Sequence, residues 1–178
     1  DKARQAIKNA REAGYDNISI DLIFGLPQMT EELWRETLDK ALSISSRGVL
    51  PQHISSYQLS VEPGSALAGM LEKGQWQEAS DEQCERQYMI LCDVLANAGY
   101  SHYEISNFAR RDENTGELKV SRHNSSYWTK EPYLGLGPAA HSYDGTHRFW
   151  NGNSVSSYSR YFLEFVGKGD AASEEAAK

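Results

Sequence analysis

The sequence predicts an α/β fold in which parallel strands, with helices outside them, form part of a barrel. Three observations lead to this prediction. Short apolar runs typical of strands alternate with amphipathic runs of helical period. Glycine, proline and capping residues stand where these elements should begin or end. The order strand, helix, strand, helix, strand requires helical crossovers, which favour a parallel sheet.

The first elements can be placed in order. Residues 2–13 have small and apolar side chains at helical spacing, so this helix should turn its apolar stripe to the sheet. Residues 17–26 form a short apolar run, typical of a strand buried on both faces. Thr30 can cap the next helix, which should end before Gly48. The expected elements after it are a strand at 53–61, a helix at 66–73, a helix from Ser80 to Gly99 and a strand at 100–105.

The sequence changes character after Arg110. Residues 121–152 are rich in glycine, aromatic residues and histidine, and no helix is obvious there. An amphipathic helix and a low-complexity tail follow; the helix has Val155, Tyr158, Phe162 and Phe165 on one side, and the tail is 170–178. We therefore expect three segments: the barrel part at 1–109, a loop-rich segment at 110–152, and the start of a C-terminal helical region at 153–178.

Composition limits the class of protein. The net charge of −7 argues against a nucleic-acid partner, because such binding depends on basic surface. No apolar run approaches the roughly 20 residues that a transmembrane helix needs. The chain begins at Asp1 without a signal sequence, so we expect it to start inside a longer cytoplasmic protein. Its only cysteines, Cys84 and Cys92, would lie about 80° apart around one helix, so they should not share a metal.

Asp21 is the sharpest local anomaly. It is the only charge in the apolar run 17–26, and a carboxylate buried there would need a partner or a ligand. A structural ion pair is one explanation. A site at the end of a parallel strand, where a ribose diol could bind, is the other.

Three motif matches fail on their context. Gly135, Gly137 and Ala140 have the spacing of a dinucleotide-binding loop, but Pro138 removes an amide, so a tight turn with close backbone approach is the better interpretation. The pair His102 and Glu104 lacks the Pro-Cys-x-x-Cys of zinc deaminases. No pair among the histidines has the helical spacing of zinc ligands; these are His102, His123, His141 and His147.

His123, Asn124, Tyr127 and Trp128 form a more suggestive group. A histidine beside two amphipathic aromatic residues suits a flat macrocycle with an axial nitrogen ligand. The structural alternative is that the first two residues cap a turn while the aromatic side chains pack on the barrel. The residues alone leave both interpretations open.

Five motifs in order carry a family resemblance: 21–27 (DLIFGLP), 60–64 (SVEPG), 103–109 (YEISNFA), 123–128 (HNSSYW) and 134–142 (LGLGPAAHS). Together they make the chain, up to about Phe165, resemble radical S-adenosylmethionine proteins of the oxygen-independent coproporphyrinogen III oxidase family. The resemblance implies the C-terminal half of a radical SAM partial (β/α) barrel. It further implies that a 4Fe–4S cluster and S-adenosylmethionine serve the full-length protein.

The resemblance also assigns roles to residues. Asp21 would contact the ribose of S-adenosylmethionine, with Ile23 and Ser60 against the adenosine and residues 135–141 approaching by backbone. The family's three cluster cysteines are absent, so this chain should hold no 4Fe–4S cluster and should be inactive alone. Gln28, Met29 and Thr30 replace the family's usual Gly-Gln-Thr, and the insertion at 110–120 is longer than expected.

The motif His-Asn-x-x-Tyr-Trp is typical of the family's heme-chaperone branch, which implies that His123, Asn124, Tyr127 and Trp128 handle heme. We therefore expect a chaperone that binds heme as cargo and delivers it to acceptor proteins. One alternative is an oxidase that decarboxylates coproporphyrinogen, and another is a fragment with no activity of its own. Part of a barrel should also expose a sheet edge, so self-association, including a homodimer, is expected.

Overall fold

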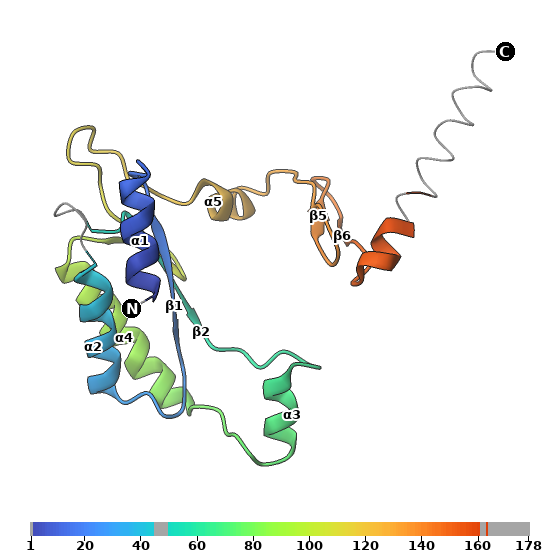
Figure 1. The fold of residues 1–178 in the computed structure, drawn as a ribbon, viewed down its shortest axis with the longest axis horizontal. Helices are drawn as coiled ribbons and strands as arrows, with labels where there is room; N and C mark the ends of the chain where they lie inside the picture. The colour runs from blue at the N-terminus through green and yellow to red at the C-terminus, as the bar shows by residue number, and fades with distance from the viewer. Residues whose placement is uncertain (1, 45–49, 161–162, 164–178) are drawn as a thin grey trace. The chain divides into compact units, whose positions relative to one another are not determined.

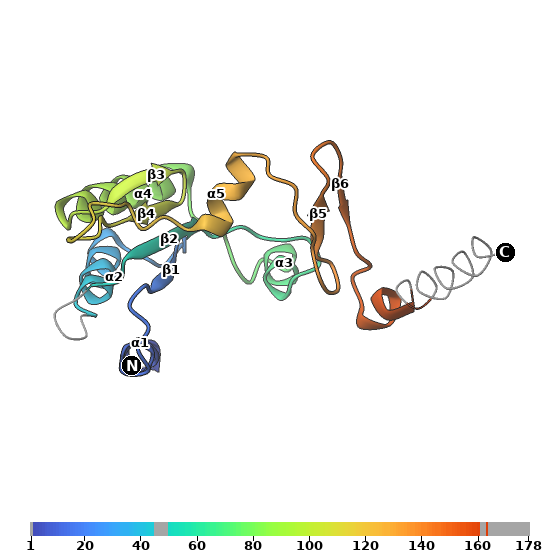
Figure 2. The same cartoon turned by 90° about the horizontal axis from the view of Figure 1, so that it is seen from above.

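The computed structural model describes residues 2–44, 50–160 and 163. The chain divides into two compact units, residues 1–121 and 122–178, which are described separately. The first unit has an α/β fold (Figures 1 and 2). Its elements are α1 (Lys2–Glu12), β1 (Ser19–Phe24), α2 (Glu31–Leu42), β2 (His53–Gln58), α3 (Ala66–Glu72), α4 (Asp81–Asn97), β3 (Ser101–Glu104) and β4 (Asn107–Ala109).

The sheet of the first unit is mixed, with strand order β1-β2-β4-β3. β1 and β2 pair in parallel, and β4 pairs antiparallel with both β2 and β3. β3 therefore runs in the same direction as β2, but β4 lies between them. The expectation of a wholly parallel sheet is wrong at this edge, because the chain turns back at Ile105 and Ser106 and inserts a strand of three residues.

The core lies between the sheet and the helices α2 and α4. Thr30 and Ser80 cap these helices by accepting hydrogen bonds from the backbone N–H groups of Leu33 and Gln83, which confirms both predicted caps. The buried cluster consists of Phe24, Trp34, Leu38, Ile54, Ile90, Leu91, Leu95, Tyr100 and Phe108. Burial of these side chains is the main favourable contribution to folding of this unit.

The other face of β1 is open, which corrects the expectation of a strand buried on both faces. Ser19, Asp21 and Ile23 are exposed, whereas Ile20 and Leu22 pack against the core. β1 is the edge strand of the sheet in the part of the chain that the structure describes. The carboxylate of Asp21 is consequently exposed and not buried, because helices cover only the opposite face.

α1 contributes no residue to this core, and the expectation that its apolar stripe would face the sheet is wrong. Only Arg11, in its last turn, is buried. The Arg11 guanidinium donates to the backbone oxygens of Tyr15 and Leu50 and to the side-chain oxygen of Gln52. Near the other end of α1, Arg4 donates to the Lys40 backbone oxygen and to Ser43 Oγ, so polar contacts attach both ends of this helix.

The second unit contains a short helix and a hairpin. α5 spans Arg122–Trp128, and β5 (His141–Tyr143) pairs antiparallel with β6 (Arg148–Trp150). The expectation of no helix in 121–152 is wrong, because α5 has no buried residue and hence no apolar stripe to reveal it. Residues 155–160 are helical as predicted, whereas Phe162, Phe165 and the tail 170–178 lie outside the described residues.

The boundary between the units falls later than the predicted segment boundary after Ala109. Residues 110–121 are joined to the first unit by backbone hydrogen bonds: Arg110 N–H donates to Gln52 O, and Lys119 N–H donates to Arg110 O. The backbone N–H of Ser121 donates to the Tyr103 hydroxyl.

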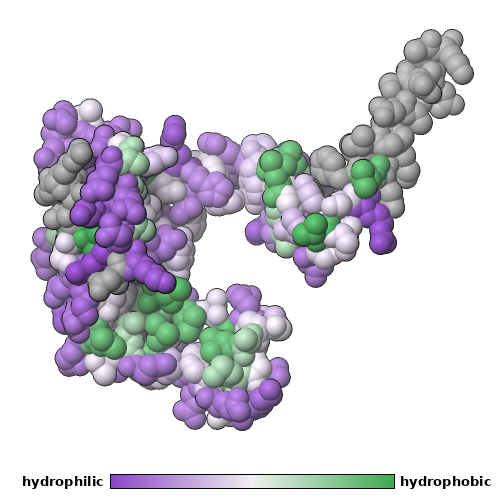
Figure 3. Space-filling view, viewed as in Figure 1, coloured by the Kyte–Doolittle hydropathy of each residue, from purple (hydrophilic) through white to green (hydrophobic). Residues whose placement is uncertain are grey.

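Within the described residues, no helix is long and apolar enough to cross a bilayer. On the surface visible in Figure 3, apolar areas form separate patches on each unit.

Candidate functional site

The open face of the sheet brings together two of the predicted cofactor residues. Asp21 and Ile23 of β1 pair in register with Ser55 and Tyr57 of β2, so their side chains share one face. Ile23 is 51% exposed and Tyr57 is 41% exposed. An accessible carboxylate next to apolar side chains such as Ile23 can accept hydrogen bonds from a diol while a flat ring packs beside it. Sequence reasoning missed Tyr57, which its register opposite Ile23 would have indicated.

Ser60 lies just beyond the end of β2 and is exposed. Its hydroxyl donates to the Glu62 carboxylate over 3.1 Å. Because β1 and β2 are parallel, Phe24 at the end of β1 and Ser60 just after β2 lie at the same edge of the sheet. Ligands commonly bind at this edge in α/β folds. The backbone N–H of Leu59 donates to Phe24 O, which holds together the two segments that leave the sheet at this edge.

A hydrogen-bonded chain crosses the same face and was not predicted. His53 Nδ1 is 2.7 Å from Ser19 Oγ, and His53 Nε2 is 2.8 Å from Tyr103 Oη. The Tyr103 hydroxyl also accepts from Ser121 N–H. This hydrogen-bond network therefore links β1, β2 and β3 to the segment that precedes α5.

The chemistry of this network is set by burial. Burial lowers the pKa of His53, and the negative charges of Asp21 and Glu104 oppose the shift. Burial also raises the pKa of Tyr103. One carboxylate oxygen of Glu104 is buried without a hydrogen-bond partner. His102 is stacked on the core residue Phe108 with ring centroids 4.3 Å apart.

In the second unit, α5 presents the predicted heme residues. His123 Nε2 lies 3.0 Å from Tyr127 Oη, and the two rings meet edge to face with centroids 5.1 Å apart. They are four residues apart and share one side of the helix. Trp128 is 59% exposed, and His123 is exposed as well. Asn124 is half-buried. The aromatic side chains are therefore accessible within this unit.

A row of tyrosine rings supports α5 within this unit. The Tyr127 ring meets the Tyr133 ring edge to face with centroids 5.0 Å apart, and Tyr133 meets Tyr143 of β5 at 6.3 Å. Tyr133 and Tyr143 also exchange two backbone hydrogen bonds. The position of His123 thus depends on the hairpin as well as on α5.

The glycine-rich motif makes a tight turn, as predicted. A Cβ at Gly135 would overlap the carbonyl oxygen of His141, so only glycine fits there. Ser142 Oγ accepts from Gly135 N–H, and the Asn151 amide donates to the Gly135 and Gly137 carbonyls. A largely apolar cleft of about 590 Å³ lies beside this turn, lined in part by Leu136, Phe149, Trp150 and Tyr158.

The residues present do not fit a 4Fe–4S cluster. Cys84 and Cys92, the only cysteines, lie on α4, buried and half-buried respectively. Among the described residues, no three His, Cys, Asp or Glu side chains group closely enough to hold a metal ion.

Comparisons with known proteins identify relatives but no matching family model. The chain is 36% identical over 153 residues to the heme chaperone HemW of Bacillus subtilis, covering 86% of this chain and 38% of the relative. It is 35% identical over 139 residues to the mitochondrial radical S-adenosyl methionine domain-containing protein 1 of Danio rerio, covering 78% and 29% respectively.

The fold has a solved counterpart. The coproporphyrinogen III oxidase HemN of Escherichia coli, a radical SAM enzyme, superposes with a TM-score of 0.66 at 20% identity, covering 91% of this chain and 37% of that one. The chain thus spans less than two fifths of the length of these proteins. The mixed α/β sheet and the relatives together show that this chain belongs to the radical SAM, HemN-like family and to its HemW branch.

Proposed function

We propose that this chain is the heme-handling part of a heme chaperone, and that α5 provides the surface on which heme binds. The observation that carries this proposal is the exposed His123 imidazole with the accessible rings of Tyr127 and Trp128 around it. Imidazole nitrogen is a common axial ligand of heme iron, and exposed aromatic rings offer a flat apolar surface to a porphyrin. Heme is the cargo here, so release to an acceptor protein requires an accessible site.

The hydrogen bond between Tyr127 and His123 affects how iron could bind. Iron can take Nε2 only if the Tyr127 hydroxyl leaves it, or it can take the other ring nitrogen, Nδ1. A single exposed hydrogen bond contributes only about 0.5–1.5 kcal/mol, so either route costs little. A weakly held imidazole suits a protein that must bind and release its cargo.

The open face of the sheet belongs to the same proposal. Asp21 would hold the ribose hydroxyls of S-adenosylmethionine, with Ile23 and Ser60 beside the adenosine, in a longer protein that also carries the cluster. The cofactor would supply a 5′-deoxyadenosyl radical there. The exposure of Asp21 and Ile23 on one face supports this placement. The two free cysteines are consistent with the reducing environment of the cytoplasm, where we place the protein.

Heme titration followed by absorbance tests the proposal. We expect a saturable Soret band with the parent chain and at least tenfold weaker binding with His123→Ala. His147→Ala is the matched control, because His147 is an exposed histidine on the β5–β6 loop, 80% exposed in its side chain. Asp21→Ala should leave heme binding unchanged, since Asp21 serves the cofactor face.

Equal heme affinity in the parent, His123→Ala and His147→Ala would contradict the proposal. It would make heme binding by this chain nonspecific and leave His123 with a structural role. Loss of binding with Asp21→Ala would instead move the heme site to the open face of the sheet.

A further inference from the structure

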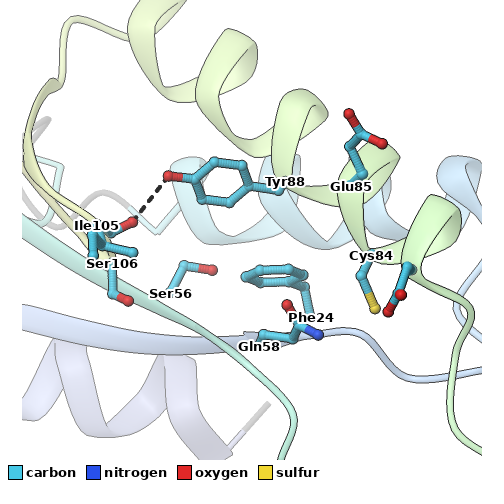
Figure 4. Close-up of a pocket in the computed structure, with 9 residues that line it drawn as sticks. Phe24, Ser56, Gln58, Cys84, Glu85, Tyr88, Ile105 and Ser106 are labelled. Carbon is cyan, nitrogen blue, oxygen red and sulfur yellow. Dashed lines mark hydrogen bonds between the residues drawn. The ribbon is translucent and has the colours of Figure 1, made fainter.

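A cleft in the first unit is not explained by heme or by the cofactor face. It lies between α4 and the ends of β1 and β2, and the β3–β4 turn borders it (Figure 4). Its volume is about 470 Å³, within the roughly 300–1,000 Å³ of small-molecule sites. Phe24, Tyr88 and Ile105 provide its apolar walls.

The wall of this cleft contains a buried hydroxyl without a partner. Ser56 is only 1% exposed, and its Oγ has no hydrogen-bond partner among the described residues. Its backbone N–H donates to Ser106 O, which fixes the strand position, and the hydroxyl is left unpaired. In Figure 4 this hydroxyl points into the space between the rings of Phe24 and Tyr88. A buried polar group costs free energy unless it is paired, and a ligand would supply the missing partner.

The apolar walls are held in place around this hydroxyl. The Phe24 and Tyr88 rings have centroids 6.0 Å apart and are tilted by 35°. The Tyr88 hydroxyl donates to the backbone oxygen of Ile105, which positions the rim. The apolar side chain of Ile105 is itself 65% exposed. These groups can enclose an aromatic or aliphatic group.

The rim of the cleft is negatively charged. Asp81 and Glu85 stand one turn apart on α4 and both line the opening. Asp81 occupies the first turn, where the helix dipole favours its charge. Glu85 makes no ion pair with any described residue, whereas the neighbouring Arg86 pairs with Glu31 at 3.0 Å. The cleft should therefore attract a cation and repel carboxylates, including the propionates of heme.

The thiol in this cleft is not the reactive group. Burial raises the pKa of Cys84, and the negative charges of Asp81 and Glu78 raise it further. A protonated thiol is a poor nucleophile, so the site fits reversible binding and not covalent capture. Together, Ser56, the apolar walls and the acidic rim define the chemistry of the ligand.

We propose that this cleft binds an organic cation: an ammonium group on an aromatic or aliphatic stem, with the stem against the walls formed by Phe24 and Tyr88 and the charge at Glu85. The ligand is either a free amine or a lysine side chain of another protein. Both carry the same chemistry, and two probes separate them. 2-Phenylethylamine represents the free amine, and a short peptide with one lysine next to phenylalanine represents the protein.

The experiment is an NMR titration of the isotopically labelled full chain with each probe. We expect saturable shifts of the backbone amides of Ser56, Tyr88 and Ile105. The neutral analogue 2-phenylethanol should bind at least fivefold more weakly than 2-phenylethylamine. Ser56→Ala and Glu85→Gln should each weaken binding at least threefold. Asp93→Asn removes an exposed carboxylate further along α4 and should change nothing.

Several results would overturn the proposal. These are the absence of saturable shifts with both probes, equal binding of the neutral analogue, or unchanged affinity in both Ser56→Ala and Glu85→Gln. Amide spectra of the variants without probe establish that they are folded, so that lost binding is not mistaken for unfolding. Heme titration of the same variants should match the parent chain, which separates this site from the one on α5.

Discussion

At the scale of single residues, Tyr127 decides whether His123 is free to ligate iron. Its hydroxyl lies 3.0 Å from Nε2 of the His123 ring. Tyr127→Phe keeps the ring and removes this hydrogen bond, which is worth about 0.5–1.5 kcal/mol. If iron takes Nε2, heme affinity should rise about two- to tenfold. Absorbance titration measures the change.

The matched variant for this test is Tyr133→Phe, which removes a hydroxyl from the next ring in the row and should leave heme affinity unchanged. Unchanged affinity in Tyr127→Phe would indicate ligation through Nδ1. Weaker binding in Tyr127→Phe would contradict both routes and make the Tyr127 hydroxyl a direct contact of the heme.

His53 should make the stability of the chain depend on pH. Burial lowers its pKa below the ordinary value of 6.5, so the unfolded chain binds a proton more readily than the folded chain. Stability should therefore fall as pH drops below about 6.5 and continue to fall until the lowered pKa is passed. Above that window the contribution of His53 is constant. Urea unfolding at several pH values measures the dependence.

In His53→Gln this part of the pH dependence should be lost, because glutamine does not titrate. Ser19→Ala serves as the control: it removes the hydrogen bond to His53 Nδ1 and should lower stability at every pH while keeping the dependence. Parallel stability curves for the parent and His53→Gln would show that His53 does not contribute.

The sequence was enough to name candidate residues, but it did not predict the surroundings of all of them. Asp21 was expected to be a buried charge because the run around it is apolar. The alternation of exposed and covered residues along β1 shows a half-covered edge strand, which an apolar run alone cannot reveal. His53 was missed because nothing in the sequence distinguishes a single histidine at the start of a strand. Its role becomes visible only through its hydrogen-bond partners on β1 and β3.

At the scale of elements, the turn after β1 depends on α4. Gly25 has a φ of +82°, and its N–H donates to the buried side-chain oxygen of Gln87. The Gln87 amide donates in turn to Met29 O. Gln87→Leu would leave the Gly25 N–H without a partner, which costs about 1–3 kcal/mol. We expect at least about 2 kcal/mol lower unfolding free energy, measured by urea denaturation.

Gln77→Leu is the control for that substitution, because Gln77 is exposed and its replacement should change stability by less than about 0.5 kcal/mol. Equal stability of the two variants would mean that water or a rearranged turn satisfies Gly25. The glycine and proline of this turn were predictable from the sequence, whereas the glutamine contact joins residues 62 positions apart and was not.

The same contrast holds for whole elements. Helices with clear caps and apolar stripes, such as α2 and α4, were placed within a few residues of their observed ends. α5 and β4 were missed: β4 has only three residues, and the seven residues of α5 are mostly polar, so neither shows a periodic apolar pattern. Both are set by tertiary contacts, β4 by pairing with its two neighbours and α5 by the row of tyrosine rings.

At the scale of the whole molecule, the sequence was most informative through the order of its motifs. No single motif could identify the family, but five in order did, and the relatives confirm it. The motif residues are distributed over both units, on β1, β3, β4, α5 and the glycine-rich turn. Local patterns therefore predicted the family better than they predicted the sheet.

The open edge of the sheet leads to a prediction about association. β1 has a hydrogen-bonded neighbour on one side only among the described residues, and Ile23 on this strand is 51% exposed. An apolar edge strand is a template for pairing with a second copy. We expect the isolated chain to associate as its concentration rises, and Ile23→Lys to shift it toward monomer because charge on an edge opposes pairing. Sedimentation velocity measures both.

Leu33→Lys provides the comparison, because Leu33 is 44% exposed and lies on α2, which is not part of the sheet. It introduces the same charge at a similarly exposed apolar site and should leave the association unchanged. If Leu33→Lys and Ile23→Lys reduce association equally, net charge is the cause and the edge of β1 is not the contact. If only Ile23→Lys does so, the edge that remains open in this chain is the surface through which copies meet.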